Sequence, residues 1–210
     1  AKDYARRASI TGGEMNVAQL EAAVKRLAEL RNQVPKAAEN PVAKLERALV
    51  GQTVGVDFFP TPPEIAQDMV ERAGIEDGMR VLEPSAGNGR IADAVKAAGV
   101  EPDVVEVSSS LREILEAKGH NLVAQDFNDF NPGPVYDRVL MNPPFSERMD
   151  VEHVRRAFGM LKPGGRLVAI MSEGPFFGSD KKATAFREWL DENGGVSEKL
   201  PDGSFAKDRT

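Results

Sequence analysis

Short apolar runs alternate with amphipathic segments along most of the chain. Runs of strand length occur at residues 80–83, 103–107, 121–124, 136–141 and 166–171. Segments whose apolar positions follow the period of a helix occur at residues 89–98, 109–118, 151–161 and 181–192. Strands joined by helices of this length are typical of right-handed β-α-β units. The pattern predicts an α/β fold: a doubly wound, mostly parallel, Rossmann-like sheet with helices on both faces.

Three local signals refine this pattern. Thr61 is a good helix N-cap residue, and the two prolines after it fit the first turn of a helix that reaches about Ala73. The segment 162–165, Lys-Pro-Gly-Gly, has the composition of a turn and is expected to precede the strand at 166–171. Residues 196–200 are a candidate sixth strand.

The first 55 residues follow a different pattern. Helical spacing from residue 15 to residue 30 places on one face Val17, Leu20, Val24, Leu27 and Leu30. Pro41 suits the start of a short second helix, expected to end at Gly51. We therefore divide the chain into a helical arm, residues 1–55, and an α/β domain, residues 56–210. The arm could pack on the domain, form a dimer or link to an upstream domain.

Composition excludes several kinds of chemistry. The 210 residues contain no Cys, which rules out disulfide scaffolds, thiolate zinc sites and thiol nucleophiles. His120 and His153 lie far apart in sequence, and we expect no metal site. No apolar run approaches the ~20 residues that a membrane span needs, and no signal peptide is visible. The predicted location is cytoplasmic, with no membrane partner.

Charge is unevenly distributed along the chain. Residues 1–50 hold nine Lys/Arg and six Asp/Glu, so that residues 51–210 account for more than the whole net charge of −6. Nucleic-acid-binding domains usually carry a basic surface, and the body of this chain does not. A nucleic-acid partner would have to be bound by a local patch, by the arm or by a part outside this sequence.

The residues after the first predicted strand are the first candidate site, because open α/β sheets bind ligands at the carboxyl ends of their strands. They read Glu83-Pro84-Ser85-Ala86-Gly87-Asn88-Gly89. The glycines let the backbone turn tightly and approach a ligand, and with Ala92 they match a dinucleotide fingerprint, which alone is a weak signal. The carboxylate of Glu83 would repel a pyrophosphate. It suits a cationic ligand such as S-adenosylmethionine, which carries an ammonium and a sulfonium.

Acidic residues also follow the next two predicted strands. Glu106 could accept both hydroxyls of a ribose. Asp126 could accept a hydrogen bond from an adenine amino group while Phe127 covers the ring face. Each carboxylate could instead be solvated or cap a helix. Their joint placement after consecutive strands favours a nucleoside site.

The fourth strand is followed by Asn142-Pro143-Pro144-Phe145, the sharpest signal in the chain. Two prolines fix the backbone and remove two N–H donors, so that the carbonyls are available as acceptors. Asn142 adds an amide, and Phe145 adds a flat apolar face for stacking. The alternative is a plain turn, for which Asn-Pro-Pro is also suitable.

With these motifs the sequence resembles the class I S-adenosylmethionine-dependent methyltransferases, and more narrowly the methylases that modify adenine N6. The glycine loop resembles their cofactor motif, and residues 142–145 match their catalytic (Asn/Asp/Ser)-Pro-Pro-(Tyr/Phe) motif. Residues 59–62, Phe-Pro-Thr-Pro, resemble the segment that closes over the methionine end of the cofactor. The order of the motifs resembles the gamma arrangement of DNA adenine methylases. The resemblance covers about residues 56–205.

The resemblance implies methyl transfer from S-adenosylmethionine to an exocyclic amine, most simply adenine N6 of DNA. It assigns catalysis to Asn142, Pro143, Pro144 and Phe145. It assigns cofactor binding to Thr61, Pro62, Glu83, Pro84, Ala86, Gly87, Gly89, Glu106, Asp126, Phe127 and Asn142. The same motif serves RNA bases and protein glutamine amides, which stay open as substrates.

The chain also departs from this family. No segment could be the target-recognition domain, and the last antiparallel strand of the family's sheet has no counterpart after residue 205. We therefore expect a C-terminally incomplete domain, whose target recognition comes from another domain or subunit. A non-catalytic module in a larger protein is the alternative from another class. A third alternative, a nicotinamide-dependent oxidoreductase, would leave the Asn-Pro-Pro-Phe segment unexplained. The oligomeric state stays open.

Overall fold

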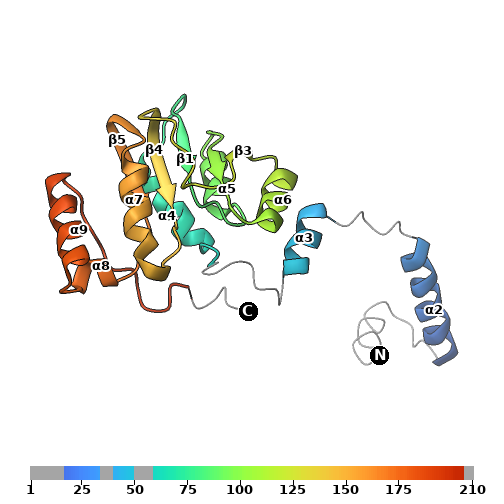
Figure 1. Ribbon diagram of the computed structural model, residues 1–210. Helices are drawn as coiled ribbons and strands as arrows, with labels where there is room; N and C mark the ends of the chain where they lie inside the picture. Colours follow the sequence, from blue (N-terminus) through green and yellow to red (C-terminus); the bar gives the residue numbers. More distant parts are fainter. Residues whose placement is uncertain (1–16, 34–39, 50–58, 206–210) are drawn as a thin grey trace. The chain divides into compact units, whose positions relative to one another are not determined.

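The computed structural model describes residues 17–33, 40–49 and 59–205 (Figure 1). The chain divides into two compact units, Ala1–Asn40 and Pro41–Thr210. Among the residues thus described, no helix is long and apolar enough to cross a membrane.

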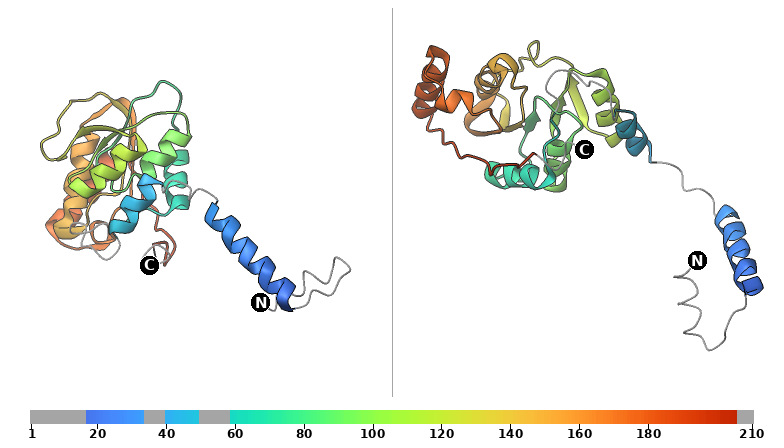
Figure 2. Two further views of the ribbon diagram at one scale, coloured as in Figure 1. Left: turned by 90° about the vertical axis from the view of Figure 1, so that its right-hand side faces the viewer. Right: turned by 90° about the horizontal axis from the view of Figure 1, so that it is seen from below.

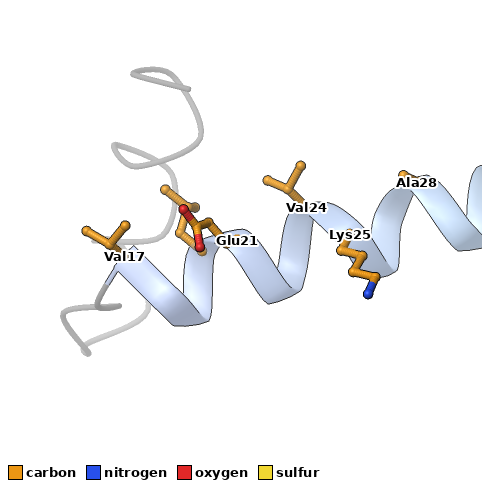
Figure 3. Close-up of a pocket in the computed structure, with 6 residues that line it drawn as sticks. Val17, Glu21, Val24, Lys25 and Ala28 are labelled. Carbon is orange, nitrogen blue, oxygen red and sulfur yellow. The ribbon is translucent and has the colours of Figure 1, made fainter.

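In the first unit, the described element is helix α2 (Val17–Gln33), which confirms the helix predicted for the arm. The beginning of the predicted helix, residues 15 and 16, lies outside the described part of the chain. Val17, Val24 and Ala28 point to the same side of α2 (Figure 3). Val17 and Val24 are exposed, so this apolar side is open to solvent within its own unit.

The second unit begins with helix α3 (Pro41–Leu49), which starts at the predicted proline and contacts α6 (Ser109–Lys118). The predicted end at Gly51 lies outside the described residues. Helix α4 (Pro63–Ala73) then leads into the sheet and ends at Gly74, whose φ of 59° closes the helix in the left-handed conformation.

Five strands form one parallel sheet, which confirms the predicted fold class. The strands are β1 (Val81–Glu83), β2 (Asp103–Val105), β3 (Asn121–Ala124), β4 (Tyr136–Met141) and β5 (Leu161–Ala169). Their order is β3-β2-β1-β4-β5, so that the order reverses between β1 and β4. Because β1 and β4 are neighbours, the two strongest sequence motifs, one after each strand, meet at the switch point where such sheets bind ligands.

Helices cover both faces of this sheet (Figure 1). On one face lie α4, α5 (Arg90–Ala97) and α6, which pack on Val81, Val104 and Leu140. On the other face lies α7 (Met149–Phe158), and α9 (Lys181–Glu192) adds Phe186 to the same core cluster, which includes Leu82 and Val139. Adjacent strand residues thus point to opposite faces, as the pleat requires.

Two short helices lie at the carboxyl edge of the sheet. The 3₁₀ helix η2 (Ser146–Arg148) follows the Asn-Pro-Pro-Phe segment, and α8 (Gly174–Phe177) follows β5. Figure 2 shows α8 next to α9 at one end of the sheet. The buried carboxylate of Asp150 connects the start of α7 to the segment after β5. It accepts hydrogen bonds from Val151 N at 3.0 Å and from Ser172 Oγ at 2.7 Å.

The structure corrects two predictions near the carboxyl end. The turn predicted at residues 162–165 does not precede the strand but lies inside it: Tyr136 pairs with Leu161 and Arg138 with Arg166, and the four residues loop out between these two pairs. Because β5 is an edge strand, it tolerates a proline and a glycine with positive φ there. The prediction of a sixth strand at residues 196–200 is wrong, because this segment pairs with no strand in the described part of the chain and Val196 is 95% exposed.

Phe186 of α9 should contribute far more to stability than an exposed ring. It is 1% exposed and stacks on Trp189, with ring centroids 5.7 Å apart. Phe186→Ala should lower the free energy of unfolding by about 3–5 kcal/mol, measured by urea denaturation. The matched control is Phe177→Ala on α8, because Phe177 is 76% exposed; that change should stay within about 0.5 kcal/mol. Equal losses in both variants would contradict this assignment of the core.

Candidate functional site

A cavity of about 280 Å³ opens at the carboxyl edge of the sheet. Its walls come from the segment before α4 and from the segments after β1, β2, β3 and β4, with α7 closing one side. This volume is close to the lower end of small-molecule pockets, roughly 300–1,000 Å³. The cavity is therefore the candidate site, and each predicted residue can be located relative to it.

The glycine loop after β1 forms the floor of the cavity. Gly87 and Gly89 have φ of 57° and 85°, which a residue with a side chain adopts only with strain. A Cβ atom on Gly89 would lie 2.9 Å from Leu115 Cδ2, so that α6 packs directly against the loop. Lys118 Nζ donates to the carbonyl of Asn88 at 2.7 Å and holds the outer side of the loop.

Glu83, the last residue of β1, is a buried carboxyl that lines the cavity. It is 1% exposed, and its Oε2 atom has no hydrogen-bond partner. Burial raises the pKa of this carboxyl well above its usual value, and nearby Asp93 and Glu106 act in the same direction. An unpaired carboxylate here would be strongly stabilised by a cationic group entering the cavity.

Glu106 follows β2 and has both carboxylate oxygens engaged. Oε2 accepts from Gly87 N and Oε1 from Ser108 N, each at 2.8 Å. Burial raises the pKa of Glu106, while these backbone hydrogen bonds oppose the rise. Because each carboxylate oxygen can accept more than one hydrogen bond, Glu106 both fixes the glycine loop and keeps acceptor capacity toward the cavity.

Asp126 and Phe127 follow β3, and both line the cavity. Asp126 Oδ1 accepts from Asn128 N at 2.8 Å, which fixes a tight turn after the strand. Phe127 is only 4% exposed, and its ring meets the imidazole of His153 edge to face at 5.2 Å. Phe127 therefore belongs to the hydrophobic core and to the cavity wall at once.

Asn142, directly after β4, has an amide whose two ends differ. Its Nδ2 donates to the carbonyl of Phe59 at 3.1 Å and to Thr61 Oγ1 at 3.2 Å. A carbonyl cannot donate, so these partners fix the orientation of the amide. The other end, Oδ1, is buried and without a hydrogen-bond partner. The site thus holds an unused acceptor at the end of β4, in a residue that lines the cavity.

The aromatic ring of Phe145 lies beside the cavity. It faces the ring of Phe59 with centroids 6.4 Å apart and an interplanar angle of 23°. It also packs on the core beneath α4, together with Phe205. Phe59 is 40% exposed and lines the cavity, so the two rings extend the cavity into an aromatic rim.

The structure brings most of the predicted site residues together. The cavity is lined by Thr61, Glu83, Pro84, Ala86, Gly87, Glu106, Asp126, Phe127, Asn142 and Pro144. The other four predicted residues, Pro62, Gly89, Pro143 and Phe145, are not among the residues that line it. The predicted N-cap role of Thr61 is wrong: Pro62 occupies the N-cap position, and the Thr61 hydroxyl accepts from Asn142 instead.

Sequence reasoning missed the contribution of α7. His153 and Met149, one turn apart on this helix, line the cavity opposite the glycine loop. Burial lowers the pKa of His153, and its Nδ1 atom is buried without a partner. Their spacing of four residues is a weak signal, since it equally fits a helix that packs on a core. No group of three or more metal-ligating side chains occurs within the described ranges.

Comparisons with known proteins support the fold. No protein-family model and no curated protein matches the chain. Among solved structures, PH1948 from Pyrococcus horikoshii, described as a putative RNA methyltransferase, superimposes with a TM-score of 0.55. That match has 22% sequence identity and covers 76% of this chain and 83% of PH1948. The similarity shows that the chain has the fold of PH1948.

Two further structures match shorter parts of the chain. TrmN from Thermus thermophilus is 29% identical over 53% of this chain, with a TM-score of 0.43. An RNA methyltransferase from Salinibacter ruber, in complex with S-adenosyl-L-homocysteine, is 22% identical over 55% of this chain and 80% of its own, with a TM-score of 0.45. The matched part of this chain spans 38% of the length of TrmN.

Gly89→Ala tests the close packing of the loop against α6. The new Cβ would meet Leu115 at 2.9 Å and His120 Nε2 at 3.2 Å. Gly78→Ala is the matched control, because Gly78 has a similar φ of 79° but no atom within 4 Å of the added Cβ. Urea denaturation should show a loss that is about 1–3 kcal/mol larger for Gly89→Ala than for Gly78→Ala. Equal losses would mean that the backbone conformation alone requires Gly89.

Glu83→Gln tests the buried carboxyl through the pH dependence of stability. The pKa of Glu83 is raised in the folded protein above its ordinary value of 4.5. Folding of the unmodified protein therefore becomes less favourable as the pH rises from 4.5 toward the raised pKa, because ionisation of Glu83 is easier in the unfolded chain. The neutral amide has no such cost. The stability of Glu83→Gln relative to the unmodified protein should therefore increase with pH across this window, measured by urea denaturation at several pH values. A constant difference would contradict the burial of a charged group.

Proposed function

We propose that the cavity binds S-adenosylmethionine and that the chain catalyses methyl transfer to an exocyclic amine of a nucleic-acid base, with adenine N6 of DNA as the first candidate. The observation that carries this proposal is the unpartnered acceptor Asn142 Oδ1, which follows β4, beside Glu83 at the end of the neighbouring strand β1. The Oε2 atom of Glu83 is also buried without a partner, and both residues line the cavity. One group suits an amine that is to be methylated, and the other suits a cationic cofactor.

The donor set of the cavity fits S-adenosylmethionine. Glu83 would take its ammonium, Glu106 its ribose hydroxyls and Asp126 its adenine amino group, with Phe127 along the ring. The glycine loop lets the backbone approach without side chains in the way. When bound, the cofactor supplies a methyl group carried on a positively charged sulfur.

Asn142 would activate the acceptor amine. The lone pair of an adenine amino group is delocalised into the ring, which makes the nitrogen a poor nucleophile. Oδ1 of Asn142 and the carbonyl of Pro143 would accept the two amino hydrogens. These hydrogen bonds strengthen as the nitrogen becomes tetrahedral and positively charged, so they stabilise the transition state more than the ground state.

The hydrogen bonds of the Asn142 NH2 group would keep Oδ1 oriented as the acceptor for the substrate amine. Because Nδ2 is held by Phe59 and Thr61, the amide cannot rotate to present a donor to the substrate. A preorganised acceptor needs no reorientation during the reaction. Phe145 and Phe59 would offer ring faces to a base that has left its stack, which offsets part of the few kcal/mol of unstacking.

Other planar NH2 groups would meet the same acceptors, so an RNA base is the second candidate and a protein glutamine the third. Recognition of a target would come from another domain or subunit. The test is incubation with S-adenosylmethionine labelled in its methyl group and with double-stranded DNA, single-stranded DNA or RNA in turn. Mass spectrometry of the nucleosides should detect N6-methyladenine. Binding of S-adenosylhomocysteine without methylation of any substrate would favour a non-catalytic binding module.

Asn142→Ala should separate catalysis from cofactor binding. Loss of the acceptor should lower the methylation rate by about 10²–10³-fold, the effect of removing one transition-state hydrogen bond. The affinity for S-adenosylhomocysteine, measured by calorimetry, should change little. Thr61→Val is the comparison variant: it removes one partner of Nδ2 but leaves Oδ1 in place, so its methylation rate should fall less than that of Asn142→Ala. An equal loss of rate and affinity in Asn142→Ala would show that the residue is structural.

A further inference from the structure

The turn between α8 and α9 presents an aromatic ring and two cations to solvent. We call residues 177–182 the α8–α9 turn. Phe177 is 76% exposed, the highest value of any aromatic residue in the described part of the chain. Lys181 and Lys182 are exposed as well, and Lys182 lies 3.6 Å from Glu152 across the surface.

This turn lies next to the candidate site. Arg148, three residues after the Asn-Pro-Pro-Phe segment, donates two hydrogen bonds to the carboxylate of Asp180, one of them at 2.6 Å. Arg148 and the preceding Glu147 both have positive φ, of 62° and 54°, so the ion pair holds a strained loop in place. The α8–α9 turn is thereby fixed to the loop that follows the proposed catalytic residues.

Hydrogen bonds fix the backbone of the α8–α9 turn. Asp180 Oδ1 caps α9 by accepting from Ala183 N at 3.1 Å. Arg187 donates to the carbonyls of Pro175 at 3.0 Å and Gly178 at 2.9 Å. Phe176, beside Phe177, packs on Phe186 in the core. A fixed backbone lowers the conformational entropy that the turn would lose on binding a partner.

Folding stability does not explain these groups. Phe177 buries little apolar surface, whereas its neighbour Phe176 packs against the core. Lys181 and Lys182 stand in the first turn of α9, where the helix dipole disfavours positive charge, and that turn contains no acidic residue. Residues 51–210 are acidic overall, so Lys181 and Lys182, four and five residues after Phe177, form a local basic segment, in which Lys182 also pairs with the exposed Glu152. Rings interleaved with cations are the usual composition of surfaces that bind single-stranded nucleic acid.

We propose that the α8–α9 turn binds the nucleic-acid strand that flanks the target base, with Phe177 stacked on a base and with Lys181 and Lys182 on phosphates. This inference rests on the proposed function, because it places the flanking strand beside the aromatic rim of the cavity. The α8–α9 turn would then be the local basic patch through which an otherwise acidic domain binds a polyanion.

The test is fluorescence anisotropy of a labelled single-stranded oligonucleotide titrated with the full chain at several salt concentrations. Phe177→Ala should weaken binding about ten-fold, the effect of losing one stacked base. Lys181→Gln with Lys182→Gln should reduce the slope of log K against log salt by about 1.4, as expected for two lost phosphate contacts. The matched control is Lys44→Gln with Lys162→Gln, which removes two exposed cations elsewhere and should leave most of the affinity and slope unchanged.

Wild-type affinity in both patch variants would overturn the proposal. So would displacement of the oligonucleotide by polyglutamate combined with unchanged affinity in Phe177→Ala, since this would indicate a surface for acidic proteins. Calorimetry with S-adenosylhomocysteine on the same samples separates the two proposals. Cofactor binding with no oligonucleotide binding refutes the patch alone, whereas patch-dependent oligonucleotide binding with no cofactor binding refutes the proposed methyltransferase function.

Discussion

The side-chain amide of Asn142 is the contact on which the arrangement of the site depends. Its Nδ2 joins the end of β4 to Phe59 and Thr61, more than eighty residues earlier in the chain. This contact holds the segment before α4 over the cavity, and it leaves Oδ1 as the free end of the amide. One residue therefore both closes the cavity wall and supplies the acceptor proposed to act on the substrate.

The electrostatics of the cavity favour a cation over a phosphate. Glu83 and Glu106 both line it, and burial raises the pKa of each carboxyl. Two acidic groups in a poorly solvated space repel anions and disfavour each other's charge. A positively charged ligand would relieve both costs at once. This electrostatic environment supports the proposal that the glycine loop, although similar in spacing to dinucleotide-binding loops, binds a cationic cofactor.

Sequence reasoning located the sheet and most of the cavity wall because both follow from local rules. Apolar runs mark strands, and the residues after parallel strands share one edge, which brought Glu83, Glu106 and Asp126 together correctly. It failed where a distant partner decides the outcome. The hydroxyl of Thr61 accepts from Asn142 rather than capping a helix. Pairing with β4 draws residues 162–165 into β5, and His153 reaches the cavity only through the packing of α7.

The pairing of β1 with β4 also determines at which stage of folding the cavity forms. Val81 lies beside Arg138 and Leu82 beside Val139, so the two motifs meet only after a long stretch of chain has closed into the sheet. Contacts of such separation form slowly and are absent from the unfolded chain. A ligand of the cavity can therefore bind the folded state alone, and at a hundred times its dissociation constant it would add about 2.7 kcal/mol to stability. Abundance of the folded protein in a cell would then follow the supply of that ligand.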